Sequence, residues 1–335
     1  MVVTRFVCVS DTHGFSTKDG VFKLPKGDVL IHAGDLTNQG TISELRKTLD
    51  WILHADFEVK IVVAGNHDVT LDKAFYSQNY ARFHNQKSEI SDECISLFAH
   101  NPEIVYLNHE PREIRLNKPD GPRTIFRVFG SPYSPAEIGD KWAFRYLNRS
   151  EEAEKLWGQI PLDTDVVVTH TPPRNHCDSC PAGSIGCEAL RRALWRVRPR
   201  LAVCGHVHHA RGYDRVWWDK TDVSRNGEVF SEAGSLPPLG SKKQCLVDLT
   251  GRKQRRLAND GSRDSNSTTA PLLDCTTALS NPDTTGAGRN ETCIINASIL
   301  ANSWPYTGGR KFFSPIIVDL DLPQDTFSDH NERRG

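Results

Sequence analysis

The sequence predicts an α/β sandwich, and three observations support this fold class. Short apolar runs rich in β-branched residues recur along the chain, as expected of strands that are covered on both faces. Stretches with apolar residues at helical spacing lie between some of these runs, and such alternation is typical of α/β proteins. Five of the runs end directly in polar residues. Ligand sites in open α/β sheets lie outside the carboxyl ends of the strands, so the five ends are predicted to meet.

The five predicted strands share a design in which a buried run delivers a chemically active side chain. The runs are residues 2–9, 29–32, 59–63, 165–169 and 201–204. The polar residues that follow them, in order, are Asp11 and His13; Asp35; Asn66, His67 and Asp68; His170; and His206 and His208. Taken alone, Gly65-Asn66-His67-Asp68 fits a polar turn as well as a functional site, because these residue types are common in turns. The other four strand ends favour the functional interpretation.

Helices are predicted where apolar residues recur every three or four positions. The first covers residues 42–53 after Thr41, a good N-terminal cap, and the second covers 186–198, where Pro199 stops it. An amphipathic helix is expected around residues 75–83, although residues 72–123 are otherwise hard to interpret. Further strands are expected at residues 104–107, 124–130, 292–297 and 316–320.

Composition excludes several classes of protein. The 335 residues carry 41 basic and 42 acidic side chains, a balance that disfavours a general nucleic-acid binder. No apolar run approaches the roughly 20 residues that span a bilayer, and the N-terminal run meets Asp11 too early for a signal peptide. The nine cysteines are an odd number and widely spread, which favours reduced thiols. We therefore expect a soluble cytoplasmic protein.

One stretch differs from the rest of the chain. Residues 251–291 are rich in small polar residues and arginine with few large apolar ones, so this segment is predicted to be disordered. The strands expected after it are too few to form a core of their own. We therefore predict a single domain over residues 1–323, interrupted by a low-complexity insertion at 251–291 and followed by a flexible tail at 324–335.

Seven of the polar residues have the character of metal ligands. They are Asp11, His13, Asp35, Asn66, His170, His206 and His208. Oxygen and nitrogen donors in this number suit two divalent or trivalent ions such as Mn, Fe or Zn, and the lack of a thiolate disfavours a structural zinc site.

Five motifs together resemble the calcineurin-like metallophosphoesterase superfamily. They are Asp-x-His, Gly-Asp, Gly-Asn-His-Asp, a lone histidine after a strand, and Gly-His-x-His, in this order. The resemblance implies a two-sheet β-sandwich flanked by helices. It also implies one ion held by Asp11, His13, Asp35 and His208, and a second held by Asp35, Asn66, His170 and His206, with Asp35 as the bridge.

The residues left over from metal binding suggest a mechanism. Two ions about 3.5–4 Å apart would acidify a bridging water, which attacks phosphorus as hydroxide, and would clamp the phosphoryl oxygens. His67 would act as the general acid that protonates the leaving oxygen. Asp68 would orient His67 and keep it protonated by charge pairing, provided that the two side chains meet.

A finer resemblance concerns the substrate. Residues 130–135, 169–173 and 295–298 are similar to the metallophosphoesterase-domain-containing branch of animals and fungi, whose members are regarded as phosphodiesterases acting on cyclic nucleotides. The expected partner is therefore a small phosphoester, with no stable nucleic-acid or membrane partner.

Two alternative functions remain. An arginine-lined phosphate pocket would favour a phosphomonoesterase or protein phosphatase, and the sequence neither assigns Arg127, Arg145, Arg174 and Arg211 to such a pocket nor excludes them from it. A catalytically silent phosphate-binding protein would be expected to lack ligands. Trp142 and Phe144 are expected in the core, with base stacking as the less favoured role.

Overall fold

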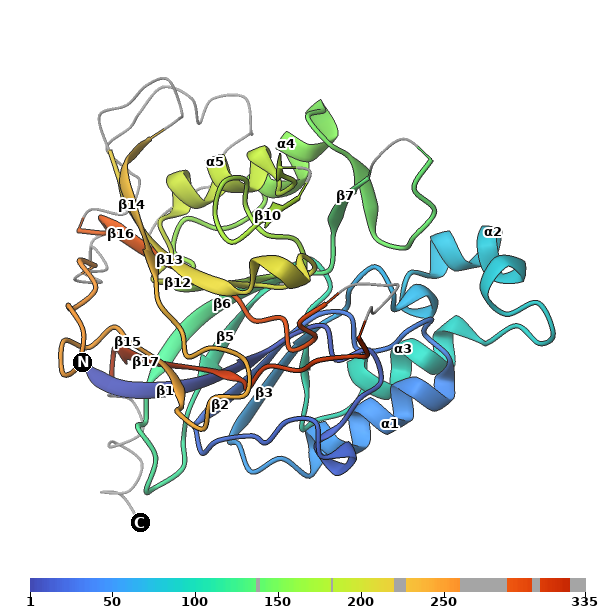
Figure 1. Cartoon of the computed structure of the whole chain (residues 1–335), viewed down its shortest axis with the longest axis horizontal. Helices are drawn as coiled ribbons and strands as arrows, with labels where there is room; N and C mark the ends of the chain where they lie inside the picture. The colour runs from blue at the N-terminus through green and yellow to red at the C-terminus, as the bar shows by residue number, and fades with distance from the viewer. Residues whose placement is uncertain (137–138, 182, 220–226, 260–287, 303–307, 326–335) are drawn as a thin grey trace, which may run out of the picture.

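The computed structural model describes residues 1–136, 139–181, 183–219, 227–259, 288–302 and 308–325. Two β-sheets face each other and helices cover their outer faces (Figure 1), which confirms the predicted α/β sandwich. The two sheets contribute the strand ends that form the site.

The first sheet is mostly parallel. Its strand order is β15 (Cys245–Asp248), β17 (Ile316–Leu322), β1 (Val2–Val9), β2 (Val29–Ala33), β3 (Val59–Val63) and β4 (Val105–Tyr106). β1 to β4 run parallel, whereas β17 pairs antiparallel with β1. The carboxyl ends of β1, β2 and β3 therefore lie at one edge of this sheet.

The second sheet has a parallel centre and antiparallel flanks. Its strand order is β14 (Glu228–Gly234), β13 (Gly212–Trp218), β16 (Glu291–Asn296), β12 (Leu201–Cys204), β9 (Val166–Thr169), β6 (Ile125–Ser131) and β5 (Glu110–Arg115). β16, β12, β9 and β6 run parallel, so the ends of β9 and β12 also point the same way.

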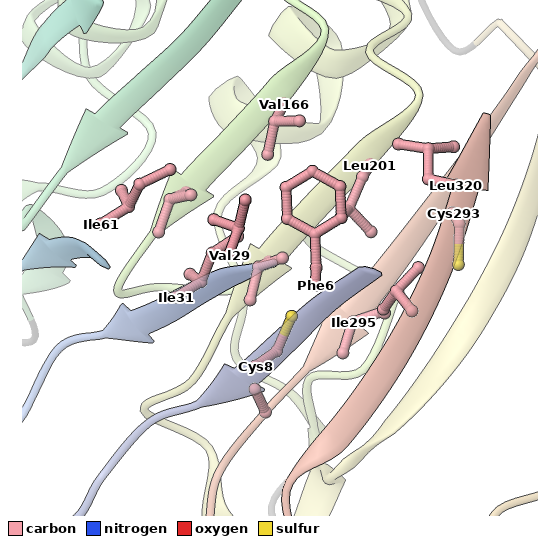
Figure 2. Packing of buried hydrophobic residues seen from close by; sticks show 14 of the residues in the cluster. Phe6, Cys8, Val29, Ile31, Ile61, Val166, Leu201, Cys293, Ile295 and Leu320 are labelled. Carbon is pink, nitrogen blue, oxygen red and sulfur yellow. The ribbon is translucent and has the colours of Figure 1, made fainter. Parts of the chain in front are cut away.

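The core lies between the two sheets (Figure 2). Phe6, Cys8 and Ile31 of the first sheet pack with Val166 and Leu201 of the second, and all of them are buried. Burial of apolar area at roughly 25 cal/mol per Å² is the main force that holds the sheets together. This packing fixes the strand ends of one sheet relative to those of the other.

Helices cover the outer faces of both sheets. α1 (Ile42–Leu53), α2 (Lys73–Phe83) and α3 (Ser91–Ala99) pack against the first sheet, and α4 (Glu151–Gly158) and α5 (Glu188–Val197) against the second (Figure 1). Thr41 and Glu44 form a capping box at the start of α1. α5 ends as predicted, because Arg198 takes a left-handed conformation (φ 49°) before Pro199.

Short elements complete the chain. Three 3-10 turns cover Thr17–Asp19 (η1), Val69–Leu71 (η2) and His208–Ala210 (η3). β7 (Ser134–Ala136) pairs with β8 (Arg145–Leu147), and β10 (Ser179–Cys180) pairs with β11 (Gly183–Ser184). None of the helices in the described ranges combines the length and apolar character that a bilayer-spanning helix needs.

The predicted insertion lies only partly within the described residues. Residues 260–287 of the segment 251–291, like residues 326–335 of the predicted tail, are outside them. The described flanks differ from the expectation of disorder, because they pack on the domain: Leu257 is buried, and Arg255 pairs with Glu291 at 2.8 Å. Composition alone does not reveal such long-range pairing.

Candidate metal centre

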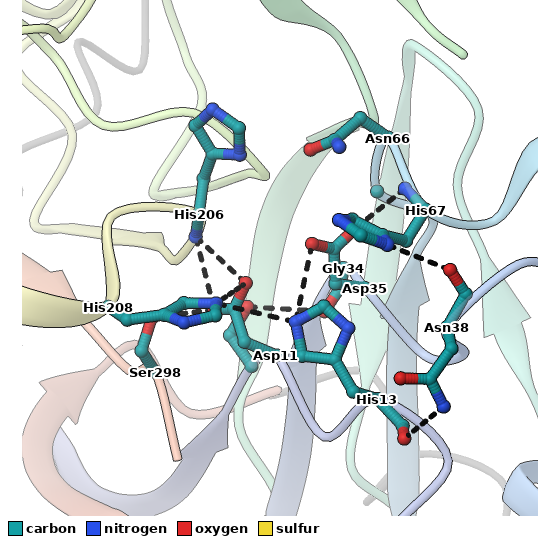
Figure 3. Close-up of polar contacts among 12 residues, drawn as sticks. Asp11, His13, Gly34, Asp35, Asn38, Asn66, His67, His206, His208 and Ser298 are labelled. Atoms are coloured by element: carbon teal, nitrogen blue, oxygen red, sulfur yellow. Dashed lines mark hydrogen bonds and ion pairs between the residues drawn. The ribbon is translucent and has the colours of Figure 1, made fainter. Parts of the chain in front are cut away.

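The ends of five strands bring the predicted ligands together (Figure 3). Asp11 and His13 follow β1, Asp35 follows β2 and Asn66 follows β3; His170 follows β9, and His206 and His208 follow β12. Among the described residues, three groups of carboxylates and histidines have ligand atoms within 4.8 Å of one another, and two of them consist only of predicted ligands: Asp11 with His13 and His208, and Asp35 with His170 and His206. The first sheet thus supplies the carboxylates and the second sheet supplies three of the four histidines.

The first group surrounds Asp11. Oδ1 of Asp11 lies 3.4 Å from Nε2 of His208, which in turn lies 3.3 Å from Nε2 of His13. All three side chains are buried. Two ring nitrogens and a carboxylate oxygen therefore face one another in a largely buried position.

Asp35 lies between the two groups. Its Oδ2 is 3.7 Å from Nε2 of His13, and its Oδ1 is 3.3 Å from Nε2 of His170. Oδ1 of Asn66 lies 3.1 Å from the same nitrogen of His170. Since each oxygen of Asp35 faces a different group, this carboxylate occupies the position that a bridging ligand needs.

Backbone carbonyls fix the tautomers of two histidines. Nδ1 of His13 lies 3.2 Å from the carbonyl oxygen of Thr37, and Nδ1 of His170 lies 3.0 Å from that of Ala33. A carbonyl only accepts, so Nδ1 carries the proton, and Nε2 of a neutral ring presents its lone pair to the cluster. The Nε2 lone pair of His170 would then face the oxygens of Asp35 and Asn66, an arrangement that a cation satisfies. The donor set therefore fits metal ions.

The protonation states agree with this interpretation. Burial lowers the pKa of His13 to about 4 and holds the pKa of His206 well below its ordinary value, so both rings are neutral ligands near pH 7. Burial would raise the pKa of Asp35, but the neighbouring His170, His67 and His13 together outweigh burial and keep that carboxyl ionised. Burial alone would lower the pKa of His170, yet Asp35 raises it to about 9, which shows how strongly this position favours positive charge.

Tight backbone approach explains the glycines of the motifs. A Cβ on Gly65 would lie 2.3 Å from the backbone nitrogen of Asp35, and one on Gly205 would lie 2.0 Å from Oγ of Ser10. Asp11, Asp35 and His206 have φ values of 55°, 51° and 67°. Such strained conformations persist where the surrounding structure enforces them, as at functional sites.

His67 lies beside the cluster and is only half-buried. Its Nδ1 donates to the carbonyl oxygen of Asn38 at 2.8 Å, so Nε2 is the nitrogen left for other partners. Its ring centroid is 4.0 Å from that of Trp142, with 32° between the planes. A ligand atom of His67 also lies within 4.8 Å of His13 and Asp35. His67 is thus held on two sides and close to the carboxylate between the groups.

Asp68 does not have the predicted partner. Its oxygens accept from the backbone nitrogens of Leu36 (3.1 Å), Thr37 (2.9 Å) and Gly65 (2.8 Å), and from the hydroxyl of Thr37. The expected pairing with His67 is therefore wrong. Asp68 instead points inward and ties the turn after β2 to the turn after β3. Burial and the nearby Asp35 raise the pKa of Asp68 to about 7, whereas the hydrogen bonds from the hydroxyl of Thr37 and the backbone nitrogens of Gly65 and Leu36 act in the opposite direction.

Sequence reasoning missed three residues of the site. Asn38 orients His67 through a backbone carbonyl, which every residue possesses, so no side-chain signal could reveal it. Trp142 was expected in the core; it is partly buried against a core cluster and also lies against the ring of His67. Ser298 donates to Oδ2 of Asp11 at 2.6 Å. The sequence around Ser298 indicates only a resemblance to relatives and no role at the site.

The chain is similar to several known proteins. The chain is 40% identical over 219 residues to a protein named "Probable rhamnogalacturonate lyase C" of Emericella nidulans, a match that covers 65% of this chain and 18% of that protein. It is 37% identical over 236 residues to metallophosphoesterase domain-containing protein 1 of Homo sapiens and Mus musculus, covering 68% of this chain and 66% of theirs. A purple acid phosphatase from yellow lupin aligns with a TM-score of 0.36 at 15% identity, over 70% of this chain and 46% of that one.

A family model gives the most direct assignment. The Calcineurin-like phosphoesterase model matches residues 4–210, which is more than half of the chain. All seven of the gathered side chains, from Asp11 to His208, lie within this range. The protein belongs to the calcineurin-like phosphoesterase family.

Proposed function

We propose that this protein is a metal-dependent phosphoester hydrolase that acts on small phosphodiesters, with small or cyclic nucleotides as the substrate class. The observation that carries the proposal is the complete set of seven oxygen and nitrogen donors around Asp35. A silent phosphate-binding relative would be expected to have lost one or more of them. The balanced charge of the chain, −1 overall, supports a small substrate rather than a nucleic acid.

The candidate ligands form two sets, one for each of two ions. Asp11, His13, Asp35 and His208 would hold one, and Asp35, Asn66, His170 and His206 the other. When bound, the cations would supply positive charge to the phosphoryl oxygens and lower the pKa of a water for attack on phosphorus. The carbonyls of Thr37 and Ala33 support this arrangement by keeping the Nε2 lone pairs of His13 and His170 available.

His67 is the proposed proton donor. Because Nδ1 is engaged by Asn38, Nε2 is the nitrogen from which a proton can pass to the leaving oxygen. Trp142 packs against the ring and limits its rotation. The half-exposed position of His67 supports access by a substrate, whereas Asp11, Asp35 and His170 are buried.

The arginines favour a diester. A monoester carries one more negative charge than a diester and would gain from an unpaired guanidinium. Arg127 instead pairs with Glu113 and with Asp163, and Arg211 donates to the carbonyl of Ser314 at 2.6 Å. Arg174 lines a cavity of about 430 Å³ whose other lining residues include none of the metal cluster.

Arg145 supports the second candidate, a phosphomonoesterase. Burial is the main cause of the low pKa of His206, and the charges of His170 and Arg145 lower that pKa further, so Arg145 acts on the cluster. It is held by Asp140 at 2.6 Å and by the carbonyl of Pro135 at 2.9 Å. A substrate dianion that displaced Asp140 would gain this guanidinium.

The test compares two substrates in one preparation. Purified protein with Mn²⁺ is assayed against bis-p-nitrophenyl phosphate and p-nitrophenyl phosphate, and then against a panel of cyclic nucleotides. We expect a higher kcat/KM for the diester, and little change of the diester rate in Arg145→Ala. Faster cleavage of the monoester, with selective loss of that activity in Arg145→Ala and not in the matched Arg127→Ala, would establish the second candidate instead.

A further inference from the structure

Ser298 lies far outside the family match and yet contacts the metal centre. The match ends at residue 210, whereas the hydroxyl of Ser298 donates to Oδ2 of Asp11 at 2.6 Å across 287 positions of chain. Both side chains are 0% exposed. A buried, short hydrogen bond to a carboxylate is among the stronger ones in proteins.

The surrounding backbone holds Ser298 in place. β16 ends at Asn296, whose Oδ1 accepts from the backbone nitrogen of Ser298 at 3.1 Å. Nδ2 of Asn296 donates to the carbonyl of Val207 at 2.9 Å, within the turn that carries His206 and His208. The nitrogen of Ile299 donates to the carbonyl of Ser10 at 2.9 Å. This segment therefore clamps both the end of β1 and the end of β12.

The contact decides how Asp11 presents its two oxygens. Oδ2 accepts the hydroxyl of Ser298, whereas Oδ1 faces Nε2 of His208 at 3.4 Å. The backbone nitrogen of His206 donates to both oxygens, at 3.1 and 3.0 Å, and so does not distinguish them. The backbone of Asn302, farther along the same segment, hydrogen-bonds to His208. Two ligands of the first ion thus depend on residues 298–302.

We propose that Ser298 is a positioning residue for the ion held by Asp11, His13, Asp35 and His208. It fixes the carboxylate of Asp11 so that Oδ1 serves the ion, and it leaves the second ion untouched. The inference rests on the proposed function only in assuming that the centre binds metal, and it holds for a diester or a monoester substrate alike. Outer-shell partners of this kind typically contribute about 10–100-fold to metal affinity.

The test measures metal binding instead of turnover. The parent protein and Ser298→Ala, both freed of metal, are titrated with Co²⁺. Binding is monitored by visible absorption and by calorimetry. We expect two ions in the parent, and in Ser298→Ala one ion with unchanged affinity and one weakened by about 10–100-fold. His208→Ala should weaken the same binding step, and Asn66→Ala should weaken the other.

Three further variants separate positioning from general stability. Ser298→Thr keeps the hydroxyl and should restore both affinities. Ser134→Ala removes another fully buried serine hydroxyl, one with no hydrogen-bond partner among the described residues, and should leave both steps unchanged. If Ser298→Ala yields no folded protein, Ser298→Cys offers a similar shape with a weak donor and should show the same selective loss. Two unchanged metal affinities in Ser298→Ala, or in Ser298→Cys where only that variant folds, would overturn the proposal, and so would equal weakening of both affinities. If neither variant folded, the role of Ser298 would be structural and the proposal would also fail.

Discussion

His170 and His176 lie on the same segment after β9, both are buried, and both face carboxylates, but their surroundings differ. His176 has a carboxylate for each ring nitrogen: Nδ1 lies 3.5 Å from Asp214, and Nε2 lies 3.3 Å from Glu228. One added proton therefore satisfies that cluster. His170 has its Nδ1 on a backbone carbonyl and shares Asp35 with the other histidines of the metal centre.

The crowding of histidines makes the difference. Nε2 of His13 and Nε2 of His208 are 3.3 Å apart, and burial and the neighbouring rings of His67 and His208 hold the pKa of His13 down at about 4, although Asp35 acts in the opposite direction. Protons cannot satisfy all of these rings at once, whereas a divalent ion satisfies several lone pairs together. A buried cluster suited to metal therefore directs several lone pairs at one point, whereas the ion-pair cluster of His176 is satisfied by a single proton.

The largest expected effect follows from removing the shared carboxylate. Asp35→Asn should lose both ions and at least about 1,000-fold in turnover, because the charge that holds both cations is removed. Metal content is measured by mass spectrometry and turnover with the diester substrate. Asp214→Asn, the matched change in the His176 cluster, should keep both ions and nearly all activity. Two tightly bound ions in Asp35→Asn would show that Asp35 is not the bridge.

The second-largest expected effect concerns His67, the proposed proton donor. His67→Ala should lower turnover by roughly 100–1,000-fold for substrates with poor leaving groups and much less for p-nitrophenolate esters, since only the former need a general acid. Metal content should stay at that of the parent. Equal loss for good and poor leaving groups would argue against the acid role, and loss of an ion would make His67 a ligand.

The local sequence was sufficient to single out the seven candidate ligands but not the residues that hold them in place. Each of the seven candidate ligands follows a buried strand, so pattern and motif together predicted both the strand and the side chain at its end. The edge strand β5 was missed for the opposite reason: it is largely exposed and reads Glu-Pro-Arg-Glu-Ile-Arg, without an apolar run. Helices α3 and α4 were also not predicted. The α4 stretch contains few apolar residues, and α3 is short and begins after Ile90, which provides no side-chain cap, so packing on the sheets determines both helices.

Supporting residues of the site were beyond reach for a physical reason. Asp68 was assigned to its neighbour His67 because adjacent residues were the only pairing visible in the sequence, yet it bonds across to Thr37 on another turn. Ser298 follows β16 of the second sheet and Asp11 follows β1 of the first. The two side chains meet because the sheets face each other in the folded sandwich, and the sequence alone does not reveal that arrangement.

The smallest expected effect concerns His176, the histidine whose cluster is satisfied by one proton. Burial alone would lower the pKa of His176, but Asp214 and Glu228 outweigh burial and raise this pKa to about 9, above its ordinary value of about 6.5. The folded state therefore binds the proton more tightly than the unfolded state. This stabilisation is fully present below about pH 6.5 and is lost as the pH rises through about 9. His176→Gln, which cannot take up the proton, should lose about 1–3 kcal/mol of unfolding free energy at pH 6 and much less above pH 9.

The measurement is urea unfolding of the parent and of His176→Gln at pH 6, 7.5 and 9. Saturating Mn²⁺ in every sample keeps the metal ligands deprotonated, so their titration does not contribute. Arg191 also faces this cluster, and its charge lowers the pKa of Glu228. Converging curves with rising pH would assign the dependence to His176. Curves that stay parallel would mean that the two carboxylates do not hold a proton on His176, and the contrast with the metal centre would fail.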